Sequence, residues 1–225
     1  MRAISWWLFL LWHRNGGNFL DEEYFAGLRN GDLCRQLLWR MDFTGSDQRE
    51  GCIPYRAPTW SWASIEGLIS GISNPVVCYT LLPNACEAEV EVISAEMTPV
   101  EGGHRTGQVV DRNIVLRGKV KAGRLRKDRS GLYRLDDMGF TDGNIRPSLL
   151  PPDFDLGDRT HLHCLLLGNV ESFPVAGGFA FTVFGLLLER LQGPLKTYQR
   201  LGTFKLTGDH CSWFDNCTSE EVILI

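Results

Sequence analysis

Alternating apolar and polar residues dominate the chain after residue 85 and predict a series of β-strands. The first run places Val90 and Val92 on one face and Glu89 and Glu91 on the other, as in a half-buried strand. Further runs of this kind lie at 114–121, 161–167, 179–184, 201–206 and 222–225. Many strands with few helices predict a mainly β fold, either a sandwich or a partly closed barrel of antiparallel strands.

Two stretches of the strand region are apolar on both faces, which is typical of central strands. They lie near Leu165 and Leu187. Before the strands, the pattern changes to helical spacing, and a short helix pair is predicted over residues 19–43. Asp21 and Asp32 can cap the two helices, and Tyr24 and Leu28 or Leu33 and Leu37 fall four apart on their apolar faces. We expect this pair to cover one edge or mouth of the sheet.

The chain is expected to form one domain, residues 19–225, behind an apolar segment, residues 1–18. The domain divides into the helix pair, a Trp-rich loop at 52–67 and the β-sheet region at 68–225. Residues 4–12 follow a positive charge, but they lack a signal cleavage site and are shorter than the ~20 residues of a transmembrane helix. This segment is packed or disordered, makes a weak membrane or partner contact, or is a true secretion signal.

Composition and charge favour a globular protein that does not bind nucleic acid. Of the 225 residues, 44% are hydrophobic, and the formal net charge is −4. The one basic stretch, Lys119 to Lys127, has no interleaved aromatic residues, which favours a solvated hairpin. The seven cysteines are irregularly spaced, which favours a reduced cytoplasmic protein with buried free thiols.

The sequence offers several candidate metal ligands but does not predict a metal site. The candidate ligands are His161, His163, Cys164, His210 and Cys211. On a strand the two histidines share a face, but Cys164 points to the other face, and no Cys-x-x-Cys pair supports zinc. Two histidines on a partly exposed strand face are the simpler interpretation.

Nucleophilic and nucleotide chemistry also lack a motif. Ser61 and Ser64 do not lie in a G-x-S-x-G turn, and neither a P-loop nor a G-x-G-x-x-G loop is present. These serines are expected to bond to the backbone of an irregular loop. The sequence therefore predicts no catalytic residue, no cofactor and no metal.

The segment from Tyr55 to Ser64 is the most distinctive in the chain, because two tryptophans stand two residues apart behind a proline. Exposed tryptophans would form a hot spot for a protein partner, whereas buried ones would anchor the loop on a core. We favour the core anchor, with Arg56 stacked on an indole or paired with acidic residues near Asp21.

Residues 55–67, YRAPTWSWASIEG, resemble a signature of fungal heterokaryon-incompatibility (HET-domain) proteins, which reads close to YRAPSWSWASVDG. The runs at 21–28 and 32–39 are similar to the family's "(D)EYLAGLW" and "DLxxQLLW", and 198–204 is similar to its "YxRxGxF". Weaker similarity extends through the strands near residues 165 and 187. The residues of the signature that we single out are Tyr55, Arg56, Pro58, Trp60, Trp62 and Ser64.

The resemblance implies a truncated, C-terminal part of a HET-type protein, because the family's TIR-like module lies upstream of the matched region. The implied role is non-catalytic: an interaction or regulatory region in nonself recognition, acting through an unidentified protein partner. The alternative is a small-molecule enzyme or ligand-binding β-barrel, with a pocket between the sheet and the helix pair.

Overall fold

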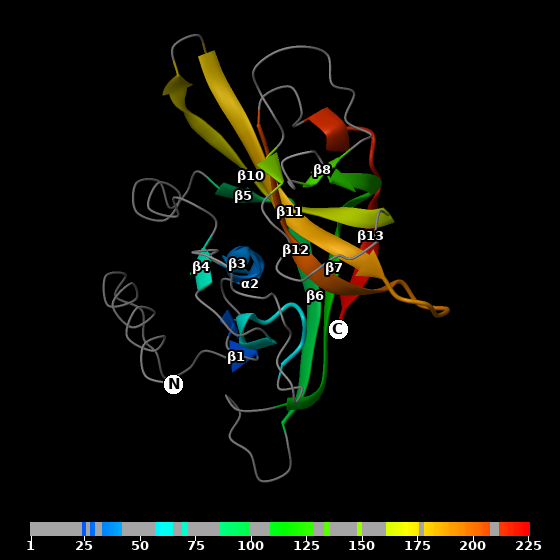
Figure 1. Cartoon of the computed structure of the whole chain (residues 1–225). Helices are drawn as coiled ribbons and strands as arrows, with labels where there is room; N and C mark the ends of the chain where they lie inside the picture. Colours follow the sequence, from blue (N-terminus) through cyan, green and yellow to red (C-terminus); the bar gives the residue numbers. More distant parts are fainter. Residues whose placement is uncertain are drawn as a thin grey trace, which may run out of the picture.

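The computed structural model describes residues 24–25, 28–29, 33–41, 57–64, 69–71, 86–99, 109–127, 133–135, 148–149, 161–175, 178–207 and 212–225. Strands predominate in these ranges, which confirms the mainly β prediction (Figure 1). Nine of the described strands form one sheet. They are β5 (Cys86–Ala88), β6 (Val90–Pro99), β7 (Val109–Lys127), β8 (Tyr133–Leu135), β9 (Ser148–Leu149), β10 (His161–Val175), β11 (Gly178–Arg190), β12 (Thr197–Thr207) and β13 (Ser219–Leu224).

The strand pairings follow a closed path. The order is β5-β10-β11-β12-β13-β7-β6, and β10 also pairs with β7. A path through five strands, β7, β10, β11, β12 and β13, therefore returns to its start. Five strands cannot alternate in direction around a closed path, so one neighbouring pair must be parallel. That pair is β12 and β13, which makes the sheet mixed rather than wholly antiparallel as predicted.

Successive residues of the central strands enter two separate hydrophobic clusters. In β10, Leu165 and Leu167 belong to one cluster, and Cys164 and Leu166 belong to the other. The first, which we call the inner cluster, takes residues from all five strands of the closed path and lies on its inner side. The second lies on the opposite face, under β8 and Phe214. β10 and β11 are thus buried on both faces, as the two-sided apolar runs predicted.

The predicted helix pair is not found in the described part of residues 19–43. β1 (Tyr24–Phe25) pairs with β2 (Leu28–Arg29) where the first helix was expected. The second is the single turn α2 (Leu33–Gln36), and β3 (Trp39–Met41) then pairs with β4 (Ile69–Gly71). Helices this short gain little from their own hydrogen bonds, so tertiary packing decides the conformation. The apolar spacing of the second helix was informative, because Leu33 and Leu37 are both buried.

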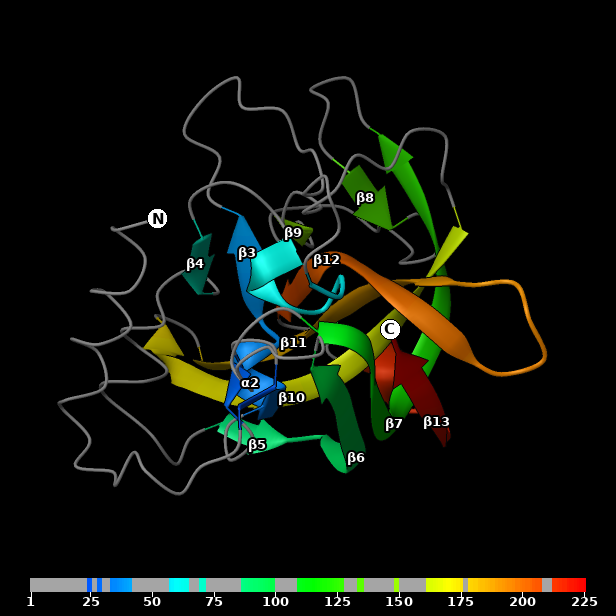
Figure 2. The ribbon, with the colours of Figure 1, turned by 90° about the horizontal axis from the view of Figure 1, so that it is seen from below.

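These N-terminal elements pack on the inner cluster. Leu28, Leu33, Leu37 and Trp60 are members of that cluster. Figure 2 shows the strands curving around α2, β3 and the segment 57–64. Side chains of the N-terminal region therefore fill one end of the closed path, and we call this the packed end.

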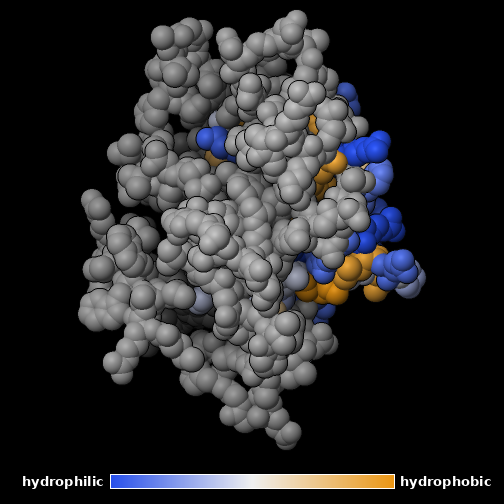
Figure 3. All heavy atoms as spheres, in the orientation of Figure 1, coloured by the Kyte–Doolittle hydropathy of each residue, from blue (hydrophilic) through white to orange (hydrophobic). Residues whose placement is uncertain are grey.

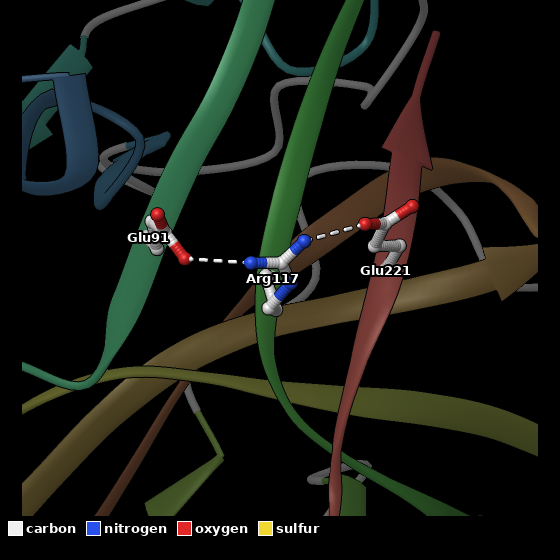
Figure 4. Close-up of polar contacts among 3 residues, drawn as sticks. All are labelled: Glu91, Arg117 and Glu221. Carbon is white, nitrogen blue, oxygen red and sulfur yellow. Dashed lines mark hydrogen bonds and ion pairs between the residues drawn. The ribbon is translucent and has the colours of Figure 1, made fainter.

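The outer face of β6, β7 and β13 carries a row of alternating charges (Figure 4). Arg117 Nη1 lies 3.1 Å from Glu91 Oε2, and Arg117 Nη2 lies 2.8 Å from Glu221 Oε1. The hydrogen bond that Arg117 donates to Glu221, together with the negative charge of Glu91, raises the pKa of Arg117. The three side chains are about half exposed, so water screens these pairs and they favour the strand register more than they add stability.

The described part of the surface is mixed in character. On the face shown in Figure 3, hydrophilic and hydrophobic residues are interspersed over the described part of the surface. The large hydrophobic residues that are exposed in the described ranges are Ile93, Leu195 and Ile225. Their scattered positions along the chain are typical of an ordinary protein surface.

Candidate functional site

The tryptophan segment, residues 57–64, is held in shape by its own serines. Ser61 N donates to Pro58 O at 2.9 Å, and Ser64 Oγ donates to Ser61 O at 2.7 Å. Ser61 Oγ accepts from Ala63 N at 3.1 Å, and the 3-10 turn η3 (Trp62–Ser64) follows. Both serine hydroxyls therefore bond to the backbone, as expected for an irregular loop.

Trp60 anchors this segment in the inner cluster. Its side chain is 0% exposed. Trp39 Nε1 donates a buried hydrogen bond of 2.8 Å to Trp60 O, which ties β3 to the segment. This burial favours the core anchor over an exposed hot spot at Trp60. Trp62 is half-buried and packs against the same cluster.

Arg200 of β12 completes the contact with Trp39. The side chain of Arg200 is also 0% exposed, and its Cζ lies 3.6 Å from the centroid of the Trp39 ring. Its Nη2 donates a hydrogen bond to Trp39 O. A guanidinium can stack on an aromatic face while it donates in its own plane, which a lysine ammonium cannot do. Arg200 thus plays toward Trp39 the role that we had expected of Arg56.

Thr59 bridges the two strands at the point where they separate. β12 and β13 are paired at Tyr198 and Leu224, and Ile225 N donates to Tyr198 O at 3.1 Å. Just beyond, Thr59 Oγ1 accepts from Arg200 N at 2.9 Å and donates to Ile225 O at 3.0 Å. The tryptophan segment is therefore joined to the sheet by both backbone and side-chain bonds.

These contacts bring together three segments that are far apart in the sequence. Trp39 ends the run 32–39, Thr59 and Trp60 belong to the signature, and Arg200 lies in the run 198–204. We call these four residues the tryptophan–arginine junction. Each of the three segments carries part of the family resemblance. Trp39 is the tryptophan of the "DLxxQLLW" motif and Arg200 is the arginine of the "YxRxGxF" motif, so these motifs could have pointed to both residues.

The signature residues are only partly within the described ranges. Tyr55 and Arg56 lie outside them. Of the others, Pro58, Trp60 and Ser64 are buried and Trp62 is half-buried. The structure therefore unites Trp60 with residues of other elements, while the remaining described members shape the loop.

The candidate metal ligands do not form a site in the described part of the chain. No group of three potential ligands occurs there, and His210 and Cys211 lie outside it. His161 is exposed and His163 half-buried, whereas Cys164 is fully buried in the other cluster. Burial raises the pKa of the Cys164 thiol well above its ordinary value, which keeps it protonated and unreactive.

The basic stretch ends in an antiparallel hairpin of β7 with β8, as expected, but it is less solvated than predicted. It belongs to β7, and Lys119 and Lys121 are half-buried. Lys121 Nζ donates to Trp213 O at 2.7 Å and lies 4.8 Å from the centroid of that indole ring. The aromatic partner comes from a distant segment, so the local sequence could not reveal it.

Within the described ranges, no helix is long and apolar enough to cross a membrane, and residues 4–12 lie outside those ranges.

Comparison with known proteins adds no relative. The chain matches no protein-family model, no curated protein and no solved structure.

Proposed function

We propose that the chain is the β-rich C-terminal region of a HET-type fungal protein and acts as a non-catalytic interaction or regulatory region in nonself recognition. The observation that carries the proposal is the tryptophan–arginine junction. Three separated segments that resemble the family make contact there through Trp39, Trp60 and Arg200. Motifs that matched by chance would have no reason to meet in one buried contact.

The packed end supports an interaction region over a pocket-based enzyme. We propose that the closed strand path is a partly closed barrel, and side chains of Leu33, Leu37 and Trp60 fill it at the packed end. The alternative function required a pocket between the sheet and a helix pair. Among the described residues, buried hydrophobic side chains of α2 and the segment 57–64 pack there against the sheet. Free thiols at Cys164 and Cys217 are compatible with the cytoplasm as the site of action.

Expression in a filamentous fungus tests this role. The chain is expressed in strains of defined incompatibility type, and growth and cell death are scored after fusion with compatible and incompatible partners. We expect expression to change the outcome of some pairings. Unchanged outcomes in every pairing, with the chain folded and abundant, would count against a role in nonself recognition.

Two matched variants connect the phenotype to the junction. Arg200→Lys keeps the charge but removes the stacked guanidinium from Trp39, and Arg117→Lys makes the same change in the exposed charge row. We expect Arg200→Lys to abolish the phenotype and Arg117→Lys to retain it. Immunoblots of both variants show whether the loss follows from lower abundance or from a folded chain that no longer acts.

A further inference from the structure

The closed strand path includes a short parallel seam between β12 and β13. In this seam, Thr197 and Tyr198 of β12 pair with Ile223 and Leu224 of β13. By contrast, β13 pairs with β7 along its whole length, and β12 pairs with β11 from Tyr198 to Thr207. Parallel pairing is also slightly less stable per residue than antiparallel pairing. Separating β12 from β13 therefore breaks fewer and weaker bonds than separating either strand from its antiparallel neighbour.

Tyr198 links this seam to His163 of β10. Its backbone O accepts from Ile225 N at 3.1 Å, and its ring meets that of His163 edge-on at 5.3 Å between centroids. Tyr198 is 1% exposed and His163 is half-buried. His163 Nδ1 is buried and has no hydrogen-bond partner among the described residues. Water can reach Nδ1 only if the packing around it loosens, and the Tyr198 ring is part of that packing.

Burial and the charge of Arg190 keep His163 neutral near pH 7. Burial lowers the pKa of His163, and Arg190 of β11 lowers it further against the opposing effect of Glu220 of β13. Glu220 forms an ion pair with Lys196. The backbone O of Lys196 accepts from Ile223 N at 3.1 Å, so this ion pair stands directly beside the seam.

The other titratable groups on the neighbouring strands do not take the place of Glu220. On β7, the residue opposite His163 is Ala122, and Arg124 stands opposite His161 one step further out. Arg124 and His161 are both exposed, so water screens their charges. On β12, burial raises the pKa of Tyr198, so its phenol stays protonated. Glu220 is therefore the acid whose charge acts on His163.

We propose that the seam is a pH-sensitive gate, in which protonation of His163 displaces Tyr198 and separates β12 from β13. A charged imidazole packed against a phenol ring needs water or an acidic partner. Water reaches it when Tyr198 moves away, and Glu220 reaches it by leaving Lys196. Both movements remove support from the seam, while the rest of the sheet keeps its pairing. The open gate exposes Leu224 and the inner cluster behind it. The gate does not depend on the role in nonself recognition.

The direction and steepness of the response follow from proton linkage. The closed gate holds His163 with a lowered pKa, whereas the open gate returns it to the ordinary value of about 6.5. The open state thus binds the proton more tightly. Its population is constant above about pH 6.5 and rises as the pH falls towards the folded-state pKa. Because one proton is taken up, the opening equilibrium increases at most about tenfold per pH unit.

Hydrogen exchange of the seam amides, followed by nuclear magnetic resonance, tests the gate. Protection factors of the Ile223 and Ile225 amides are measured in the full chain from about pH 7 to about pH 5, with intrinsic exchange rates divided out. We expect both to fall by up to about tenfold per pH unit, and amides of the ladder between β10 and β11 to fall less. Seam protection that is independent of pH, or that falls in step with this ladder, would overturn the proposal.

Two histidine variants identify the sensor. His163→Gln removes the titrating group, so its seam protection should not depend on pH over this range. His161→Gln makes the same change at the exposed histidine of the same strand, and it should respond like the wild type. A lost response in His161→Gln, or a retained one in His163→Gln, would show that His163 is not the sensor.

A measurement on the wild type serves if His163→Gln does not fold. The ring signals of His163 should titrate below about pH 6.5, because the closed gate disfavours the imidazolium. Titration at or above that pH would overturn the proposal, since protonation would then not drive the gate open.

Discussion

Replacing Trp60 with alanine is the most direct test of the packed end. The indole is 0% exposed and belongs to the inner cluster. A tryptophan buries about 150–250 Å², which at about 25 cal/mol per Å² corresponds to roughly 4–6 kcal/mol. Trp60 Nε1 has no partner among the described residues, and Trp60 O keeps its bond from Trp39. We therefore expect Trp60→Ala to lower the free energy of unfolding by about 4 kcal/mol, within the usual range for such truncations.

Urea unfolding followed by far-ultraviolet circular dichroism measures this loss. Two companion variants give a graded series. Trp60→Phe retains most of the apolar volume and should cost about 1–2 kcal/mol. Trp62→Ala removes a half-buried ring and should cost about 2 kcal/mol. The reasoning fails if Trp60→Ala shifts the unfolding midpoint no more than Trp62→Ala does, because burial would then not determine the loss.

Three further predictions follow from described contacts. Gly185→Ala should prevent folding or lower the free energy of urea unfolding by more than about 3 kcal/mol, because the added Cβ would lie 2.0 Å from Leu165 O. Gly118→Ala should lower it less, because its Cβ would meet only side-chain carbons, at 3.0 Å and beyond. Thr59→Val should cost about 1–2 kcal/mol by the loss of two hydrogen bonds, and Thr59→Ser should restore most of this. Because the folded-state pKa of His163 is lowered, stability should be complete above pH ~6.5 and fall as the pH decreases; melts of His163→Gln should lack this decline.

The strand pattern could be predicted because half-buried strands leave a period-two record in the sequence. Alternation placed Val90 and Val92 in β6, and the two-sided apolar run near Leu165 identified a central strand. The parallel pairing of β12 and β13 could not be predicted in this way, because alternation says nothing about the direction of a neighbouring strand. A parallel pair is required because the closed path contains an odd number of strands.

The N-terminal elements were mispredicted for a different reason. The spacing of Tyr24 and Leu28 suits a helix, yet both residues lie in short paired strands. Such short elements take the conformation that buries their apolar residues best, and the surface on which they pack comes from distant strands. Local patterns therefore revealed which residues are buried, such as Leu33 and Leu37, but not their secondary structure.

The sequence predicted only the Trp60 part of the tryptophan–arginine junction. The signature indicated that Trp60 anchors a loop on a core, but the partners Trp39 and Arg200 come from other segments. Neighbours across strands could not be predicted either, because the register exists only in the folded sheet. Nothing in the sequence places Arg124 beside His161 or Arg190 level with it.

The bond between Thr59 and Ile225 has a consequence for synthesis on the ribosome. The two residues are 166 positions apart, so translation at about 5–20 residues per second separates them by roughly ten to thirty seconds. During that interval, Trp60 lacks the last strand, β13, that helps to enclose it. Such long-range closure slows folding and leaves apolar surface open to other chains. The tryptophan segment is therefore the place where we expect chaperones to hold the nascent chain.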